Sequence, residues 1–116
     1  MRDMSDGKTS ALPTLAAPPL QEDLVYQTLS DPVRRRVLVF LARHGPKTAS
    51  DLNGNVRRKL SATTKHLQVL RESGMVIMSE NPSDRRKALY SLTPLVRVFK
   101  NEHAAVIDFG FCTIKL

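Results

Sequence analysis

The sequence predicts an α+β fold that is mainly α, and three observations support this prediction. Apolar residues recur at helical spacing through much of residues 21–74. Two short segments with strand character follow, and a turn-rich loop joins them. The chain has 116 residues, of which 41% are hydrophobic, so it can bury one core without disulfides or metals. One compact domain is therefore expected rather than a two-domain enzyme.

Residues 1–20 are expected to form a flexible N-terminal arm. Pro13, Pro18 and Pro19 interrupt its apolar character, and it lacks the basic start and apolar stretch of a secretory signal. The longest apolar run of the chain, residues 37–42, is far shorter than the ~20 residues of a membrane-spanning helix. The single cysteine, Cys112, excludes an intramolecular disulfide and indicates a reducing, cytoplasmic setting.

Two helices are expected in succession after the arm. A short helix over residues 21–29 is predicted by one apolar stripe, formed by Leu24, Val25 and Leu29. Residues 30–32, Ser-Asp-Pro, then supply a capping side chain and a proline that suits a first helical turn. The second helix is expected to end at residues 44–46, His-Gly-Pro.

The next segment is expected to contain a turn and then the most regular helix. Thr48 or Ser50 can cap a helical turn, and residues 53–55, Asn-Gly-Asn, have the composition of a turn. Ser61 is the expected N-cap of the helix that follows, and Gly74 stands where a left-handed C-cap belongs. One face of this helix is polar at the spacing i, i+3, i+4 and i+7, with Ser61, Thr64, Lys65 and Gln68.

Residues 75–80 and 88–92 have strand character, and residues 81–87 form a basic turn between them. Helices, a polar-striped helix and a basic hairpin follow one another in the order of a winged helix-turn-helix with a two-stranded wing, over residues 21–93. Residues 94–116 are expected to form a helix/strand extension that contributes to dimerisation. A helix over residues 93–105 is predicted, although its valines also suit a strand. Apolar side chains alternate with others over residues 107–116, which predicts one strand there. The expected dimer contacts are Leu24, Val25, Leu29, Leu95 and Phe99.

The net charge of +7 is concentrated in the middle of the chain. Residues 34–87 contain 13 basic and 4 acidic residues, a net charge of +9. Such a segment indicates a polyanionic partner, with a solvated basic face as the alternative. A membrane surface is disfavoured, because the basic residues stand beside short polar side chains rather than exposed Trp or Phe.

Two segments of the sequence resemble ArsR-type transcriptional regulators. Residues 29–38, LSDPVRRRVL, resemble the opening of that family, and residues 64–76, TKHLQVLRESGMV, are similar to its recognition helix. Residues 84–93, which begin Asp-Arg-Arg and end Leu-Thr, resemble the wing of MarR-type regulators. The family's common A-x-x-L-G-L-S turn is absent from residues 53–59. The resemblance implies a dimeric repressor that occludes a palindromic operator on double-stranded DNA.

The polar-striped helix can enter the major groove, where its side chains reach base edges. Base reading is expected from Ser61, Thr64, Lys65 and Gln68. Backbone contacts are expected from Arg57, Arg58, Lys59, His66, Arg85, Arg86 and Lys87. For the arginines and lysines the alternative is solvated loop charge. His66 is expected to pack half-buried while touching the backbone, with direct base contact as its alternative. Residues 34–36, three arginines, can reach phosphate or form structural salt bridges, and Asp84 is expected to pair with Arg85 or Arg86.

No cofactor, metal or catalytic function is expected. His103 lacks a second histidine at helical spacing, and Cys112 is expected to pack as an apolar residue, with a disulfide between protomers as the alternative. Residues 108–110, Asp-Phe-Gly, match a kinase triplet without the other kinase motifs, and no nucleophile arrangement is present. The alternative function is a winged helix that binds an acidic protein partner. The effector and the operator are not predicted.

Overall fold

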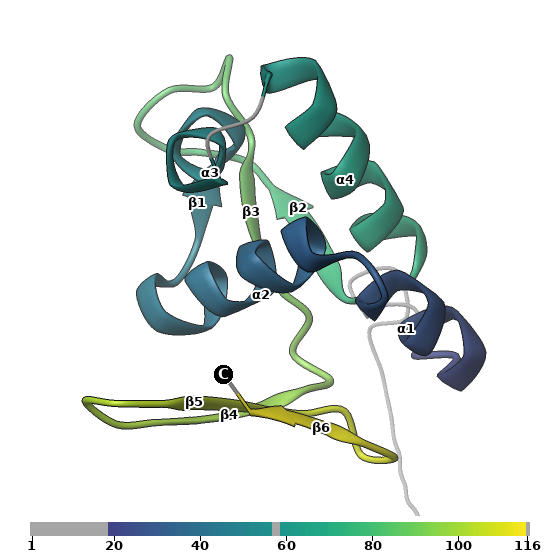
Figure 1. Cartoon of the computed structure of the whole chain (residues 1–116). Helices are drawn as coiled ribbons and strands as arrows, with labels where there is room; N and C mark the ends of the chain where they lie inside the picture. The colour runs from purple at the N-terminus through teal and green to yellow at the C-terminus, as the bar shows by residue number, and fades with distance from the viewer. Residues whose placement is uncertain (1–18, 57–58, 116) are drawn as a thin grey trace, which may run out of the picture.

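The computed structural model describes residues 19–56 and 59–115. The expected N-terminal arm therefore lies almost wholly outside the described residues, as do Arg57 and Arg58. The helices of the described part are α1 (Glu22–Leu29), α2 (Pro32–His44), α3 (Ala49–Val56) and α4 (Leu60–Glu72). Its strands are β1 (Lys47–Thr48), β2 (Val76–Ser79), β3 (Leu89–Leu92), β4 (Arg97–Lys100), β5 (Ala105–Asp108) and β6 (Thr113–Lys115). Figure 1 shows α2 at the centre, with α3, α4 and the first sheet above it, α1 to its right and the second sheet below.

The boundaries of α2 confirm the prediction, because local signals define both of its ends. Asp31 is the N-cap, and its Oδ1 accepts hydrogen bonds from the backbone N–H of Val33 at 2.7 Å and of Arg34 at 3.3 Å. Partial burial alone would raise the pKa of Asp31, but these two N–H donors outweigh it and lower that pKa. Gly45 ends the helix with a positive φ of 79°, which an L side chain rarely adopts.

Two arginines of α2 bind the end of α1. The Nε of Arg34 donates a 2.8 Å hydrogen bond to the carbonyl oxygen of Thr28, and the guanidinium of Arg35 donates to the carbonyl oxygen of Leu29. These carbonyl groups are at the C-terminus of a helix, where cations are favoured and acceptors lack partners. Both arginines therefore hold α1 against α2. Of the two roles left open for residues 34–36, phosphate contact or a salt bridge, neither is what Arg34 and Arg35 show here: they bond to backbone oxygens.

The predicted turn at residues 53–55 is wrong, because these residues belong to α3. Thr48 and Asp51 form a reciprocal cap at its start, with N–H to side-chain oxygen distances of 3.2 and 3.3 Å. Further along, Leu52 is fully buried in the core, and the Oδ1 of Asn53 accepts a hydrogen bond from Thr63. Packing and this side-chain bond override the turn composition of Asn-Gly-Asn.

The start of α4 also differs from the prediction. Ser61 is not the N-cap: the helix begins at Leu60, and Lys59 is the N-cap residue without a side-chain capping bond. The other end is confirmed, with Ser73 as C-cap followed by Gly74 at φ 84°. Ser61 therefore lies inside the first turn with its side chain exposed.

The first sheet contains the predicted hairpin and one additional strand. Its order is β1-β3-β2, all antiparallel, with Met78 opposite Tyr90 and Tyr90 opposite Lys47. The two-residue strand β1 precedes α3, so the sheet connects the hairpin to the start of the helix-turn-helix. The wing hairpin is confirmed, and β1 makes the sheet three-stranded.

The predicted helix over residues 93–105 is wrong, and β4 and β5 occupy this part of the chain. Residues 107–116 are not one strand either, because a turn separates β5 from β6, with Gly110 at φ 94° and a 2.8 Å bond from the N–H of Phe109 to the carbonyl of Cys112. The sheet has the order β4-β5-β6. Ala105 and Ile107 of β5 are fully buried, whereas Val106 between them is only half-buried. Because α2 buries one face of this sheet, the segment forms strands, which is the alternative that its valines also suit.

The hydrophobic core is continuous from the helices to the second sheet. It includes Val37 and Leu41 of α2, Leu67 of α4, and Ile107 and Phe109 after the wing. The Nζ of Lys100 adds a polar contact, at 3.1 Å from the carbonyl oxygen of Arg43 at the end of α2. In the described part of the chain, no helix is long and apolar enough to cross a membrane.

Candidate nucleic-acid interface

The polar stripe of α4 faces solvent. Ser61, Thr64, Lys65 and Gln68 are all exposed, while Thr63, Leu67 and Leu70 on the opposite side are fully buried. The buried side fixes the rotation of the helix about its axis. Rotating the helix would expose its leucines and break the hydrogen bond between Thr63 and Asn53. The four predicted base-reading residues thus lie together on one accessible face.

Two members of the stripe have partners within their own helix. The hydroxyl of Thr64 donates a 2.9 Å hydrogen bond to the carbonyl oxygen of Leu60, which leaves its methyl group and lone pairs available. The Nε2 of Gln68 lies 3.3 Å from the Oε2 of Glu72, and both side chains are exposed. A solvent-exposed bond of this kind is readily exchanged for an external partner, so Gln68 can present its amide to a ligand.

His66 and Lys59 lie at the margins of this face. His66 is half-buried, and its Nδ1 is 3.5 Å from the Nη1 of Arg34, so the ring is directed toward α2. This matches the expected half-buried packing. Lys59 is exposed immediately before α4. Arg57 and Arg58, the other two residues of the predicted basic run, lie outside the described residues.

The wing tip is organised by Asp84. Its Oδ1 accepts from the Nε of Arg86 at 3.2 Å and from the backbone N–H of the same residue at 3.0 Å, and these bonds lower the pKa of the Asp84 carboxyl. The pairing expected for Asp84 is confirmed with Arg86. Arg85 instead has its Nε 3.7 Å from Glu80, with both side chains largely exposed. Such exposed pairs contribute little stability, so the guanidinium groups remain available to a stronger anion.

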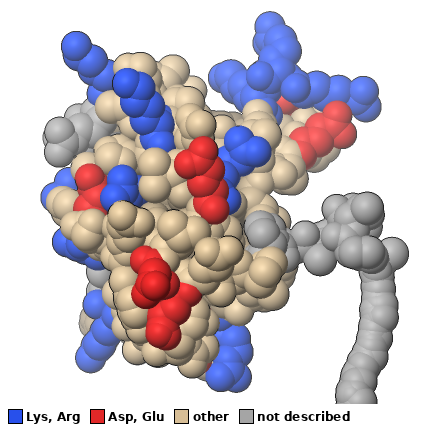
Figure 2. Space-filling model, turned by 90° about the vertical axis from the view of Figure 1, so that its right-hand side faces the viewer, with Lys and Arg blue, Asp and Glu red and all other residues tan. Residues whose placement is uncertain are grey.

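Basic side chains gather at the end of the molecule that carries the wing and the start of α4. Figure 2 shows Lys and Arg projecting from the upper end, with acidic side chains beside them at the upper right, and further Lys and Arg at the lower end. Lys65 on α4 and residues 85–87 at the wing are exposed. Exposed positive charge on and beside a polar helix face is typical of a surface that binds a polyanion.

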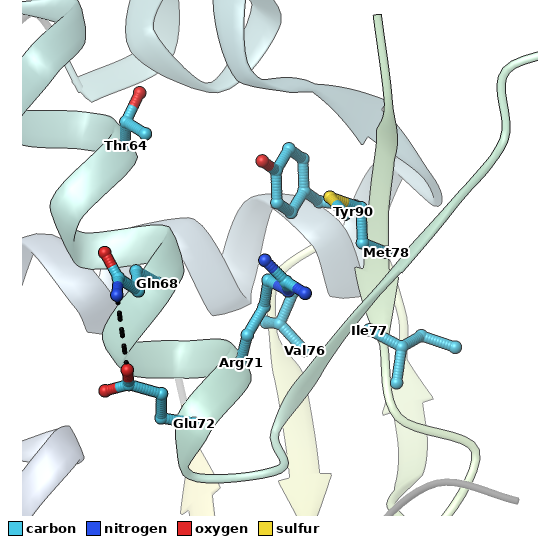
Figure 3. A pocket seen from close by; sticks show the side chains of 8 residues that line it. All are labelled: Thr64, Gln68, Arg71, Glu72, Val76, Ile77, Met78 and Tyr90. Carbon is cyan, nitrogen blue, oxygen red and sulfur yellow. Dashed lines mark hydrogen bonds between the residues drawn. The ribbon is translucent and has the colours of Figure 1, made fainter.

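A hollow of about 520 Å³ separates α4 from the wing sheet (Figure 3). Its lining residues are Thr64, Gln68, Arg71, Glu72, Val76, Ile77, Met78 and Tyr90. No role was predicted for Arg71 or Tyr90 from the sequence. The signal for Arg71 was present, because it follows Gln68 by three residues and continues the polar stripe by one turn. Tyr90 gave no such signal, since its place beside α4 follows only from the pairing of β2 with β3.

The five predicted dimer residues differ in how far their side chains are exposed. Leu24, Leu95 and Phe99 are 37%, 49% and 55% exposed. Val25 is fully buried in the core of its own chain, and Leu29 packs partly against that core. Val25 is therefore shielded from a second chain by its own fold. Three of the five residues are accessible to a partner.

Cys112 is partly buried beside Tyr26. Burial, followed by the charge of Glu22, raises the pKa of the Cys112 thiol, so the sulfur stays protonated at neutral pH. A protonated thiol is a poor nucleophile and a poor metal ligand. Within residues 19–56 and 59–115, no group of three or more His, Cys, Asp or Glu side chains is arranged to hold a metal ion.

The helices α3 and α4, with the adjoining hairpin, make this fold a winged helix-turn-helix. A family model described as a helix-turn-helix domain matches residues 29–78. No curated protein sequence matches the chain.

Solved structures give the same fold. YusO from Bacillus subtilis is 27% identical with a TM-score of 0.55, and the match covers 61% of this chain and 50% of that one. A single-residue mutant of ZitR from Lactococcus lactis is also 27% identical, with a TM-score of 0.52 and coverage of 54% and 42%. Reduced AbfR bound to DNA is 25% identical, with a TM-score of 0.53 and coverage of 63% and 53%. The chain thus spans about half the length of these proteins.

Proposed function

We propose that the chain is a DNA-binding transcriptional regulator in which α4 reads bases from the major groove. The observation that carries this proposal is the exposed stripe of Ser61, Thr64, Lys65 and Gln68 on a helix whose other side is buried. Side chains of this length and polarity, spaced over two turns, can reach several base pairs in one groove. Gln68 suits adenine, Lys65 suits guanine or phosphate, and the methyl of Thr64 suits a thymine methyl.

The wing supplies contacts to the backbone in this proposal. Arg85, Arg86 and Lys87 stand at the tip of a hairpin beside α4, and Lys59 precedes the helix. Phosphate contacts from both ends would fix the register of α4 without reading sequence. The DNA-bound state of AbfR, a protein with the same fold, supports this use of the fold.

The proposed active form is a homodimer that represses transcription by covering its operator. A two-fold dimer would place two α4 helices on a palindromic site, with half-sites about 10 bp apart. Leu24, Leu95 and Phe99 are the accessible apolar residues that we assign to the dimer contact. The resemblance of residues 29–38 and 64–76 to ArsR-type regulators supports both the dimer and the repressor role.

Selection of bound duplexes from a random pool tests this function directly. The expected result is enrichment of one symmetric sequence, whose affinity exceeds that of a scrambled duplex at the same salt concentration. Binding without enrichment would reduce the proposal to non-specific DNA association. Failure to bind any duplex at low salt would instead favour an acidic protein as the partner of the basic face.

A further inference from the structure

The hollow between α4 and the wing lies on the path that DNA must take in the proposed complex. In the proposed complex α4 lies in the major groove and the wing tip contacts the backbone beside it, and a sugar–phosphate strand borders that groove on the side of the wing. That strand must therefore pass between α4 and the β2–β3 hairpin. The hollow of about 520 Å³ is located between these two elements.

Arg71 is placed to contact this strand. At about 100° per residue, Arg71 and Thr64 lie within ~20° of each other on α4, at the edge of the stripe that faces the wing. Figure 3 shows the guanidinium of Arg71 directed into the hollow below Tyr90, whereas Glu72 is directed away toward Gln68. The ion pairs formed among the described residues join other arginines to Glu80, Asp84 and Asp108, and Arg71 takes no part in them.

Tyr90 closes the other side of the hollow. Its ring packs against the hydrophobic core, and its strand position is fixed by pairing with Met78 on one side and Lys47 on the other. Figure 3 shows the phenol hydroxyl pointing toward α4 across the hollow. No hydrogen bond within the described residues uses this hydroxyl, so it can donate to an external oxygen.

We propose that this hollow binds a phosphodiester strand of DNA, with the guanidinium of Arg71 and the hydroxyl of Tyr90 as donors to its phosphate oxygens. Arginine matches phosphate with two parallel donors, and tyrosine adds a neutral one. The contact carries no sequence information and fixes the distance between α4 and the wing on the duplex. The inference rests on the proposed DNA-binding function and adds two residues to it.

Salt titrations of Arg71→Ala test the guanidinium. The magnitude of the slope of log affinity against log salt should fall by about 0.9, as expected when one phosphate contact is lost, and by the same amount on operator and scrambled duplexes. Arg71→Lys should retain the slope. Arg43→Ala, which removes an arginine from the last turn of α2, is the matched control and should leave the slope unchanged. Tyr90→Phe should weaken both duplexes equally without changing the slope, because it removes a neutral donor.

Duplexes with single neutral methylphosphonates locate the contact. The wild type should lose affinity at one phosphate between the contacted grooves, and Arg71→Ala should be insensitive at that position, while thermal unfolding verifies that the variant is folded. An unchanged slope for Arg71→Ala, or equal sensitivity of both proteins at every phosphate, would overturn the inference while leaving DNA binding intact. Failure of the wild type to bind any duplex would overturn both proposals.

Discussion

The hydroxyl of Thr63 on α4 donates a hydrogen bond of 2.7 Å to the Oδ1 of Asn53 on α3, and Thr63 is fully buried. This bond joins the two helices of the helix-turn-helix at the point where they pack. It also explains why Asn53 lies inside a helix. Asparagine favours turns, but here its side chain has a hydrogen-bond partner in α4. The orientation of α4 is thus fixed by a polar contact as well as by the leucines beneath it.

Thr63→Val should lower the free energy of unfolding by about 1 kcal/mol. Valine fills the same volume but removes the donor, which leaves the Asn53 oxygen without its partner. Urea denaturation followed by circular dichroism measures the change. Thr64→Val is the matched control: Thr64 is exposed and bonds within its own helix, so we expect a change of at most about 0.5 kcal/mol. Equal losses for the two variants would contradict the role of the Thr63 bond.

Asp31→Asn should reveal a pH-dependent contribution of the α2 cap. The folded-state pKa of Asp31 lies below its ordinary value of 3.8, so the carboxylate adds stability above that pH, and this contribution is lost as pH falls through the folded pKa. Asparagine also caps a helix but does not titrate. The stability difference between wild type and variant should therefore be present at pH 6 and diminish below about pH 4. A stability difference that does not vary with pH would show that the charge of Asp31 does not stabilise the folded protein.

Lys65→Ala combined with Gln68→Ala should reduce the preference for the selected operator more than it reduces general affinity. Each base contact of this kind contributes ~1–3 kcal/mol of discrimination. Competition titrations with operator and scrambled duplexes at one salt concentration measure both quantities. If the two affinities fall by the same factor, these side chains contact the backbone rather than the bases.

Arg85→Ala and Arg86→Ala should each lower the salt slope by about one unit if the wing tip contacts phosphates. Asp84→Asn is an informative companion, because it removes the carboxylate that holds Arg86 at 3.2 Å. It should raise affinity for any duplex, since a negative charge near the phosphates is lost. Slopes that match the wild type in both arginine variants would place the wing away from DNA.

Phe99→Glu should shift the protein from dimer to monomer. Phe99 is 55% exposed on β4, and the guanidinium of Arg97 lies 5.8 Å from the centre of its ring. A buried charge at an apolar contact between two chains costs several kcal/mol. Sedimentation velocity measures the change, and Met78→Glu on β2, another exposed apolar side chain, serves as control. A mass that is the same for wild type and Phe99→Glu would move the dimer contact elsewhere.

The elements that were predicted well are those with local signals. Asp31, Pro32 and Gly45 specify both ends of α2 within a few residues of sequence, and Gly74 does the same for the end of α4. The hairpin of β2 and β3 followed from strand composition around a turn. The exposed stripe on α4 followed from helical period alone, which depends on no distant contact.

The remaining features depend on contacts between distant parts of the chain. Asn53 is helical because of Thr63, and residues 97–100 form a strand because β5 pairs with them and α2 covers the sheet. Tyr90 faces α4 only because β3 pairs with β2. Val96, Val98 and Val106 could not by themselves distinguish helix from strand, and in the structure Val96 is buried while Val98 is exposed.

The bond from Lys100 to the end of α2 has a mechanical consequence. Lys100 belongs to the second sheet, and α2 packs directly on α4, so α2 connects that sheet to α4. If two copies meet through Phe99, their two α4 helices are held at one fixed separation by a rigid spacer. The protein would then tolerate base changes in its operator far better than the insertion of a single base pair at the centre.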